Sequence, residues 1–161
     1  MKTIKLTIIL LITVVFSRVN VLTQDNQTIA ILDIDAINTL YKGTEITRLL
    51  RLEAKKLKKE MILDVYDMKE IFAENNFNDT ACYSKNCGIK AGKLLNADKV
   101  VTGSIEKFGN KMIISLNLIE VKTEKIINQD VSEFINKEDE IQRMLRISIQ
   151  KLMTGQPEEQ L

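Results

Sequence analysis

The sequence contains no histidine, and this absence excludes more chemistry than any other feature of its composition. Histidine is the usual general base near neutral pH and the commonest protein ligand for metals. Without it, the serine–histidine and cysteine–histidine arrangements that activate nucleophiles cannot form. We therefore expect a protein that is not an enzyme and that holds no metal and no cofactor.

The chain also lacks an excess of charge of either sign. It has 23 lysine and arginine residues against 22 aspartate and glutamate residues. Residues 1–24 contain three of the basic residues and none of the acidic ones, so the net charge of the remainder falls from +1 to −2. Nucleic-acid binding needs a strongly basic face, so we expect no nucleic-acid partner.

The apolar run near the N-terminus is too short to cross a bilayer, which takes about 20 residues. A basic start, Met1–Lys5, precedes the apolar run Leu6–Phe16, and a more polar stretch, Ser17–Gln24, follows it. This order is typical of a secretory signal peptide. We expect cleavage between about residues 17 and 24, a mature form in the periplasm without a stable membrane span, and no lipid anchor. The alternative is an uncleaved anchor that continues through Val19–Leu22.

No internal repeat and no long linker divides residues 25–155, so we expect one α/β domain there, followed by a disordered tail at 156–161. The predicted order is β-α-β-α-α-β-β-β-α, a mixed sheet with a parallel first half, an antiparallel C-terminal meander and helices on both faces. Strands are expected at Thr28–Ile34, Met61–Val65, Asp98–Phe108, Met112–Ile119 and Ile126–Ile135. Helices are expected at 44–57, 67–74, 84–95 and 137–155.

Local signals support these boundaries. Gly109-Asn110 is a two-residue hairpin signal, and the residues after it alternate between apolar and polar as a half-buried strand does. Asp67 and Ser84 are expected to cap the second and third helices. The glycine-rich segment Gly88–Lys93 lacks the spacing of a phosphate-binding loop and lies within a helix, so we interpret its small residues as close packing against the sheet.

Cys82 and Cys87 are the only cysteines. In an oxidising compartment, a local disulfide that holds this loop to the start of the following helix is the simplest interpretation. A redox-active pair is less favoured because the spacing is not Cys-x-x-Cys. A metal site is disfavoured because two thiols without histidine make an incomplete set of ligands.

Four aspartates stand near the ends of the first two predicted strands: Asp33, Asp35, Asp64 and Asp67. Ligands of open α/β sheets bind at the carboxyl ends of the strands, where paired carboxylates could hold a cation or an amine. Ordinary turn and cap residues are the alternative interpretation. A second candidate surface is the loop from Asn75 to Asn86, where Phe77 is the prominent apolar side chain.

The central segment resembles a known group of small envelope proteins. The resemblance lies in Glu70–Phe77, the two cysteines, Ala91–Ile105, the hairpin at Gly109-Asn110 and Leu116–Thr123. These are the CsgG-like proteins, which share their fold with the amino-terminal domain of TolB and with LpoB-type activators of penicillin-binding proteins. Glu124 stands where this resemblance leads us to expect a glycine in the last hairpin turn.

The resemblance implies a non-enzymatic interaction module in the periplasm, peripheral to the outer membrane. Its partner would be another envelope protein, bound through a sheet edge or the 75–86 loop, and a homo-oligomer is left open. An accessory role in outer-membrane secretion or cell-wall assembly follows by the same analogy. The alternative function is binding of a small ligand or cell-wall fragment at the acidic strand ends.

Overall fold

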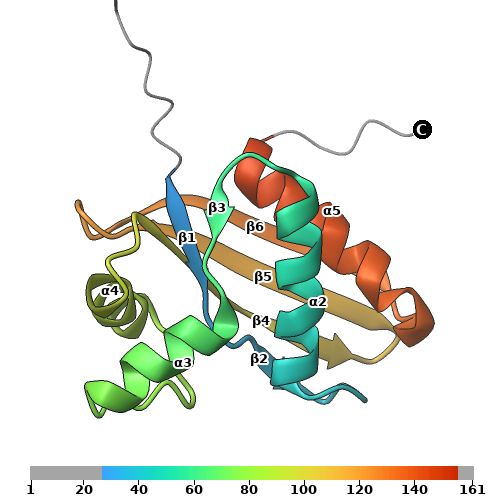
Figure 1. Ribbon diagram of the computed structural model, residues 1–161. Coiled ribbons are helices and arrows are strands. Elements are labelled where there is room, and N and C mark those ends of the chain that lie inside the picture. Colours follow the sequence, from blue (N-terminus) through green and yellow to red (C-terminus); the bar gives the residue numbers. More distant parts are fainter. Residues whose placement is uncertain (1–26, 156–161) are drawn as a thin grey trace, which may run out of the picture.

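The computed structural model describes residues 27–155, so the predicted signal peptide and the predicted disordered tail lie outside the described residues. Within them, one mixed sheet carries helices on both faces, as the sequence predicts (Figure 1). The elements in chain order are β1 (Thr28–Ile31), β2 (Asp35–Ile37), α2 (Gly43–Lys56), β3 (Met61–Ile62), α3 (Val65–Glu74), α4 (Lys85–Leu94), β4 (Lys99–Phe108), β5 (Lys111–Glu120), β6 (Lys125–Ile135), the short 3-10 helix η2 (Glu138–Glu140) and α5 (Ile141–Thr154).

The strands follow the order β3-β1-β4-β5-β6, and β2 pairs with β4 beyond the end of β1. β3, β1, β2 and β4 are parallel, whereas β4, β5 and β6 form the predicted antiparallel meander. β1 lies between β3 and β4 in the sheet. The chain passes from β1 to β3 on one side of β1 and then crosses back to β4 on the other side. This reversal makes the carboxyl end of β1 the topological switch point of the sheet, where ligands of open α/β folds bind.

Two hydrophobic clusters lie on opposite faces of the sheet. On one face, α2 and α5 cover the side chains of β1, β4 and β5 that alternate inward, among them Ile31, Ile105 and Leu116. On the other face, α3 and α4 pack over Ala30 and Val100. In Figure 1, α2 and α5 lie together at the right of β1, and α3 and α4 lie at the left.

The first strand differs from its prediction. Thr28–Ile34 is nearly all apolar and was expected to be one strand, with a loop from Ala36 to Gly43 after it. The strand instead ends at Ile31, and a separate strand, β2, begins at Asp35. Both pieces pair with β4, β1 with Lys99–Val101 and β2 with Ser104–Glu106. The first strand is therefore broken at residues 32–34, opposite the middle of β4.

The second helix also begins earlier than predicted. The strand before it ends at Ile62, and α3 starts at Val65. Its N-cap is Asp64, whose Oδ1 accepts a hydrogen bond from the amide of Tyr66 at 2.8 Å. Asp67 is not the cap but lies inside the first turn, where its negative charge still favours the positive end of the helix dipole. The prediction of Ser84 as the cap of α4 is confirmed.

The glycine predictions are confirmed by the contacts that a side chain would make. A Cβ on Gly92 would lie 2.5 Å from Val121 and 2.7 Å from Val100, so α4 can approach the sheet only because this residue is small. The hairpin at Gly109-Asn110 joins Phe108 to Lys111 as expected, with Gly109 at φ 59°. In the next turn Glu124 itself adopts the left-handed conformation, with φ 57°, and its carboxylate pairs with Lys93 at 2.5 Å.

Gly103 provides a direct test of the packing between β4 and β5. A Cβ at this position would lie 2.1 Å from the carbonyl oxygen of Ser115 and 3.0 Å from the Cα of Leu116. Because both obstacles are backbone atoms, we expect Gly103→Ala to lower the free energy of unfolding by about 1–3 kcal/mol or more. Urea denaturation measures the change, with Ser104→Ala on the same strand as the control. Equal stability of the two variants would contradict the close backbone contact between β4 and β5 at Gly103.

Asp98 connects the starts of β1 and β4. Its carboxylate accepts hydrogen bonds from the amide of Thr28 at 2.8 Å and from the Thr28 hydroxyl at 3.0 Å. These bonds, the backbone one first, hold the pKa of Asp98 below its ordinary value. A carboxyl whose pKa is lowered by folding stabilises the fold above its unfolded-state pKa and loses that effect as the pH falls.

We therefore expect Asp98→Asn to lower the urea midpoint at pH 7, and the difference from the wild type to shrink as the pH falls from about 5 to 3. Glu70→Gln, at an exposed side chain in the middle of α3 without such bonds, is the control. A difference that stays constant over this pH range would contradict the assignment.

Candidate functional site

The break in the first strand creates the candidate site. Asp33 lies in this break, at the carboxyl end of β1 and at the topological switch point. Two side chains of α2 form hydrogen bonds with backbone groups next to the break. The amide of Ile34 donates to Oγ1 of Thr47 at 2.8 Å, and the guanidinium of Arg51 donates to the carbonyl oxygen of Ile31 through Nε, at 3.1 Å, and through a terminal nitrogen.

A groove of about 450 Å³ lies beside this break, between α2 and α3. That volume is within the range of sites that bind small molecules and short peptides. Four cationic side chains line the groove: Arg48, Arg51, Lys55 and Lys69. Two of the predicted acids, Asp33 and Asp64, line it as well, so its ionisable groups carry a net charge of about +2.

Arg51 lies at the inner wall of this groove. Burial lowers the pKa of its guanidinium, while the nearby carboxylates of Asp33, Asp64 and Asp79 act in the opposite direction. Arginine stays protonated in proteins despite such a shift. Asp33 and Arg51 therefore bring opposite charges near one another at the end of β1, where both line the groove.

The other sequence candidates lie elsewhere. Asp35 is in β2 beside Ser104, on the face of the sheet opposite to α2, and Asp67 is exposed on α3 outside the groove lining. Phe77 is half-buried and packs against Phe72, with ring centroids 4.9 Å apart. The structure thus brings two of the four aspartates together at the groove, and it uses Phe77 to support α3.

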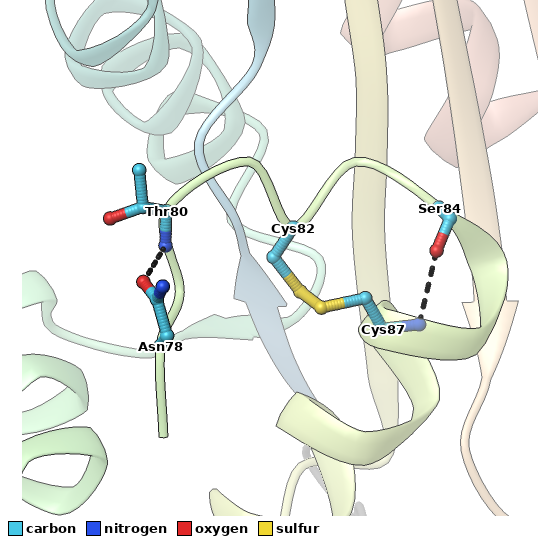
Figure 2. Close-up of a disulfide and its surroundings, with 5 residues drawn as sticks. All are labelled: Asn78, Thr80, Cys82, Ser84 and Cys87. Atoms are coloured by element: carbon cyan, nitrogen blue, oxygen red, sulfur yellow. Dashed lines mark hydrogen bonds between the residues drawn. A yellow bond between two sulfur atoms is a disulfide. The ribbon is translucent and has the colours of Figure 1, made fainter. Parts of the chain in front are cut away.

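The cysteine loop lies on the other side of the break. The sulfurs of Cys82 and Cys87 are joined in a disulfide with the Cα atoms 5.4 Å apart, and Ser84 caps α4 next to it (Figure 2). Figure 2 also shows the turn in which the Thr80 amide donates to Asn78. Tyr83, between the cysteines, is half-buried, and burial together with the charges of Asp35 and Asp33 raises the pKa of its phenol.

A second surface, which the sequence did not indicate as apolar, is the half of the sheet that α3 and α4 leave uncovered. The strand register places on this face a group of apolar side chains: Ile37, Phe108, Ile113, Val131 and Ile135. We call this group the open sheet face. Phe108, Val131 and Ile135 are 69%, 68% and 72% exposed, so nothing in the described part of the chain covers them.

The open sheet face ends at β6, whose outer edge is also free. This strand has 11 residues and pairs only with β5 among the described strands. Its length is about twice that of a typical strand. A long strand edge presents a row of unpaired backbone donors and acceptors to which another chain can add a strand.

The cations of the groove were missed because the sequence pattern shows them as the solvent-facing side of α2. Arg48, Arg51 and Lys55 recur at intervals of three and four residues, which places them on one side of the helix. Only the position of α3 reveals that this side faces a second helix. The spacing, combined with the switch point at β1, is the signal that could have identified them.

Comparison with known proteins establishes the fold. No protein-family model and no curated protein sequence matches the chain. Among solved structures, the C-terminal domain of LpoB from Salmonella enterica is similar at a TM-score of 0.60 and 15% identity, over 69% of this chain and 84% of that one. TolB from Acinetobacter baumannii is similar at 0.53 and 16% identity, over 82% of this chain and 29% of TolB.

PelC from Paraburkholderia phytofirmans, solved as a dodecamer, is similar at a TM-score of 0.52 and 12% identity, over 80% of this chain and 87% of PelC. The chain therefore shares its fold with the C-terminal domain of LpoB and with part of TolB. None of the helices between residues 27 and 155 is long and apolar enough to span a membrane. The same residues contain no group of three or more acidic or cysteine side chains placed to hold a metal ion.

The disulfide closes a loop of six residues. Loop-closure entropy predicts that such a bond stabilises the fold by about 2 kcal/mol. We expect the double variant Cys82→Ser/Cys87→Ser to lose about this much in urea denaturation. Reduction of the wild type should raise its mass by about 2 Da and give it the stability of the variant. Two free thiols in protein purified under oxidising conditions from the envelope would contradict the bond.

Proposed function

We propose that this protein is an exported, non-enzymatic interaction module of the cell envelope that binds another envelope protein through the open sheet face and the edge of β6. The observation that carries this proposal is the exposure of Phe108, Val131 and Ile135 beside a free strand of 11 residues. Exposed apolar patches next to free edges are typical of protein interaction sites. The missing histidine supports a role in binding.

The proposed location is the periplasm, peripheral to the outer membrane. It rests on the predicted signal peptide and on the resemblance to the CsgG-like group, to which we propose that the chain belongs. The fold similarity to LpoB and TolB supports this assignment. In that location we propose that the protein has an accessory role in outer-membrane secretion or in cell-wall assembly.

The partner is either a different envelope protein or a second copy of this chain. The dodecameric state of PelC is a property of that protein, but it supports testing for self-association here. Either partner could add a strand at the edge of β6, because strand addition depends on backbone hydrogen bonds. The apolar side chains of the open sheet face would then determine which partner binds.

A second candidate function is the binding of a small ligand or cell-wall fragment at the strand ends. The observation that favours it is the groove between α2 and α3, which contains Asp33 and Asp64. Asp35 and Asp67 do not line this groove. This function would use a different surface from protein binding, so both can occur in one molecule.

Site-specific photocrosslinking in cells tests the first function. A benzophenone side chain at Val131 or Phe108 should give one discrete adduct of the full chain, because both positions lie on the open sheet face. The same probe at Lys90, an exposed residue of α4, should give none. An adduct at twice the monomer mass identifies a second copy, and any other discrete mass identifies a different envelope protein. No adduct at either position, or equal adducts at Lys90, would contradict the proposal.

A further inference from the structure

None of the four cations that line the groove takes part in an ion pair between described residues. Seven ion pairs join lysine or arginine to glutamate elsewhere in the fold, for example Lys99 to Glu60 and Lys107 to Glu138. Arg48, Lys55 and Lys69 line the groove and take part in none of these pairs or of the hydrogen bonds between described residues. Three exposed cations without an ion-pair partner thus line one groove, together with the carboxylates of Asp33 and Asp64.

The acids in the groove restrict what an anionic ligand can be. Asp33 and Asp64 would repel a ligand of closely spaced phosphates, such as a nucleic acid. A peptide avoids this conflict because it carries hydrogen-bond donors on its backbone as well as carboxylates on its side chains. Its amides can donate to Asp33 while its carboxylates reach Arg48, Lys55 and Lys69.

Apolar side chains of the groove also fit a peptide. Leu52 and Tyr66 line it and are 46% and 78% exposed, so they offer contact area to an aliphatic or aromatic residue. A free inorganic anion could use the cations but would leave this surface uncovered. The mixture of cations, acids and apolar side chains therefore matches a chain of amino acids.

The length of the groove sets the spacing of the ligand's charges. Its lining follows α2 from Thr44 to Lys55, which is about 16 Å along the helix axis. An extended peptide of about five residues covers that distance. Arg48 and Lys55 are seven residues apart, about 10 Å, which equals the separation of extended residues at positions one and four.

We propose that the groove between α2 and α3 binds an extended acidic peptide segment with carboxylates three residues apart and an apolar residue between them. The carboxylates pair with Arg48 and Lys55, Lys69 adds to the positive field, and the apolar residue contacts Leu52 and Tyr66. The peptide backbone donates to Asp33 at the end of β1. This inference rests on the second candidate function and specifies its ligand class.

Fluorescence anisotropy with the purified mature protein tests this inference. The probe is the fluorescein-labelled peptide Gly-Glu-Ala-Leu-Glu-Ala. We expect saturable binding that weakens as salt is added, and at least tenfold weaker binding of the matched peptides with glutamine or lysine in place of both glutamates. A labelled oligothymidylate of similar charge should also bind at least tenfold more weakly.

Two charge-matched double variants locate the site. Arg48→Glu/Lys69→Glu should weaken binding of the acidic peptide at least tenfold, whereas Lys90→Glu/Lys125→Glu, at cations outside the groove, should change it less than twofold. Arg48→Gln/Lys69→Gln repeats the test without added acids, and urea denaturation checks that each variant is folded. Val131→Asp on the open sheet face should leave peptide binding unchanged, which separates this inference from the protein-binding function.

Several outcomes would overturn the inference. Equal loss in the two glutamate variants would mean that the peptide responds to overall charge only. Equal affinity for oligothymidylate would assign the groove to polyanions, and equal affinity for the glutamine peptide would remove the role of the cations. No saturable binding of the acidic peptide at millimolar concentration would exclude this ligand class, whatever the photocrosslinking at β6 shows.

Discussion

The break between β1 and β2 is the constraint on which the rest of the structure depends. A buried strand that stops leaves an amide and a carbonyl without partners, and each such group must find a hydrogen bond. Thr47 receives the amide of Ile34 and donates to the carbonyl of Gly43 at 2.7 Å, so one hydroxyl joins the break to the first turn of α2. One turn further along α2, the guanidinium of Arg51 donates a hydrogen bond to the carbonyl oxygen of Ile31. These bonds fix α2 against the end of β1 and leave the space toward α3 as the groove.

Much of the fold could be predicted from the sequence because its signals are local. Gly109-Asn110 and the alternation from Met112 onward define the meander, and the contacts of Gly92 explain why α4 needs a small residue. The break at residues 32–34 could not be predicted, because an apolar run has the same pattern in a continuous strand as in a broken one. At the break the amide of Ile34 bonds to a hydroxyl on a helix 13 residues later, and that contact exists only after folding.

The candidate site was predictable only in part, for a related reason. Asp33 and Asp64 follow two parallel strands, and strand order alone brings them to one edge. Asp35 was separated from them because β2 resumes pairing with β4 and turns its side chain to the other face. The cationic residues of α2 have the pattern of an ordinary solvated helix face. These residues line a groove only because α3 lies opposite them, and the periodicity of α2 gives no information about the position of α3.

Asp33 lies between two ionisable groups on different sides of the break. Its charge opposes the lowering of the Arg51 pKa by burial, and with Asp35 it adds to the raising of the Tyr83 pKa. Arg51 lines the groove, whereas Tyr83 belongs to the loop that the disulfide closes. The break in the first strand therefore places one carboxylate within electrostatic reach of both the groove and the cysteine loop.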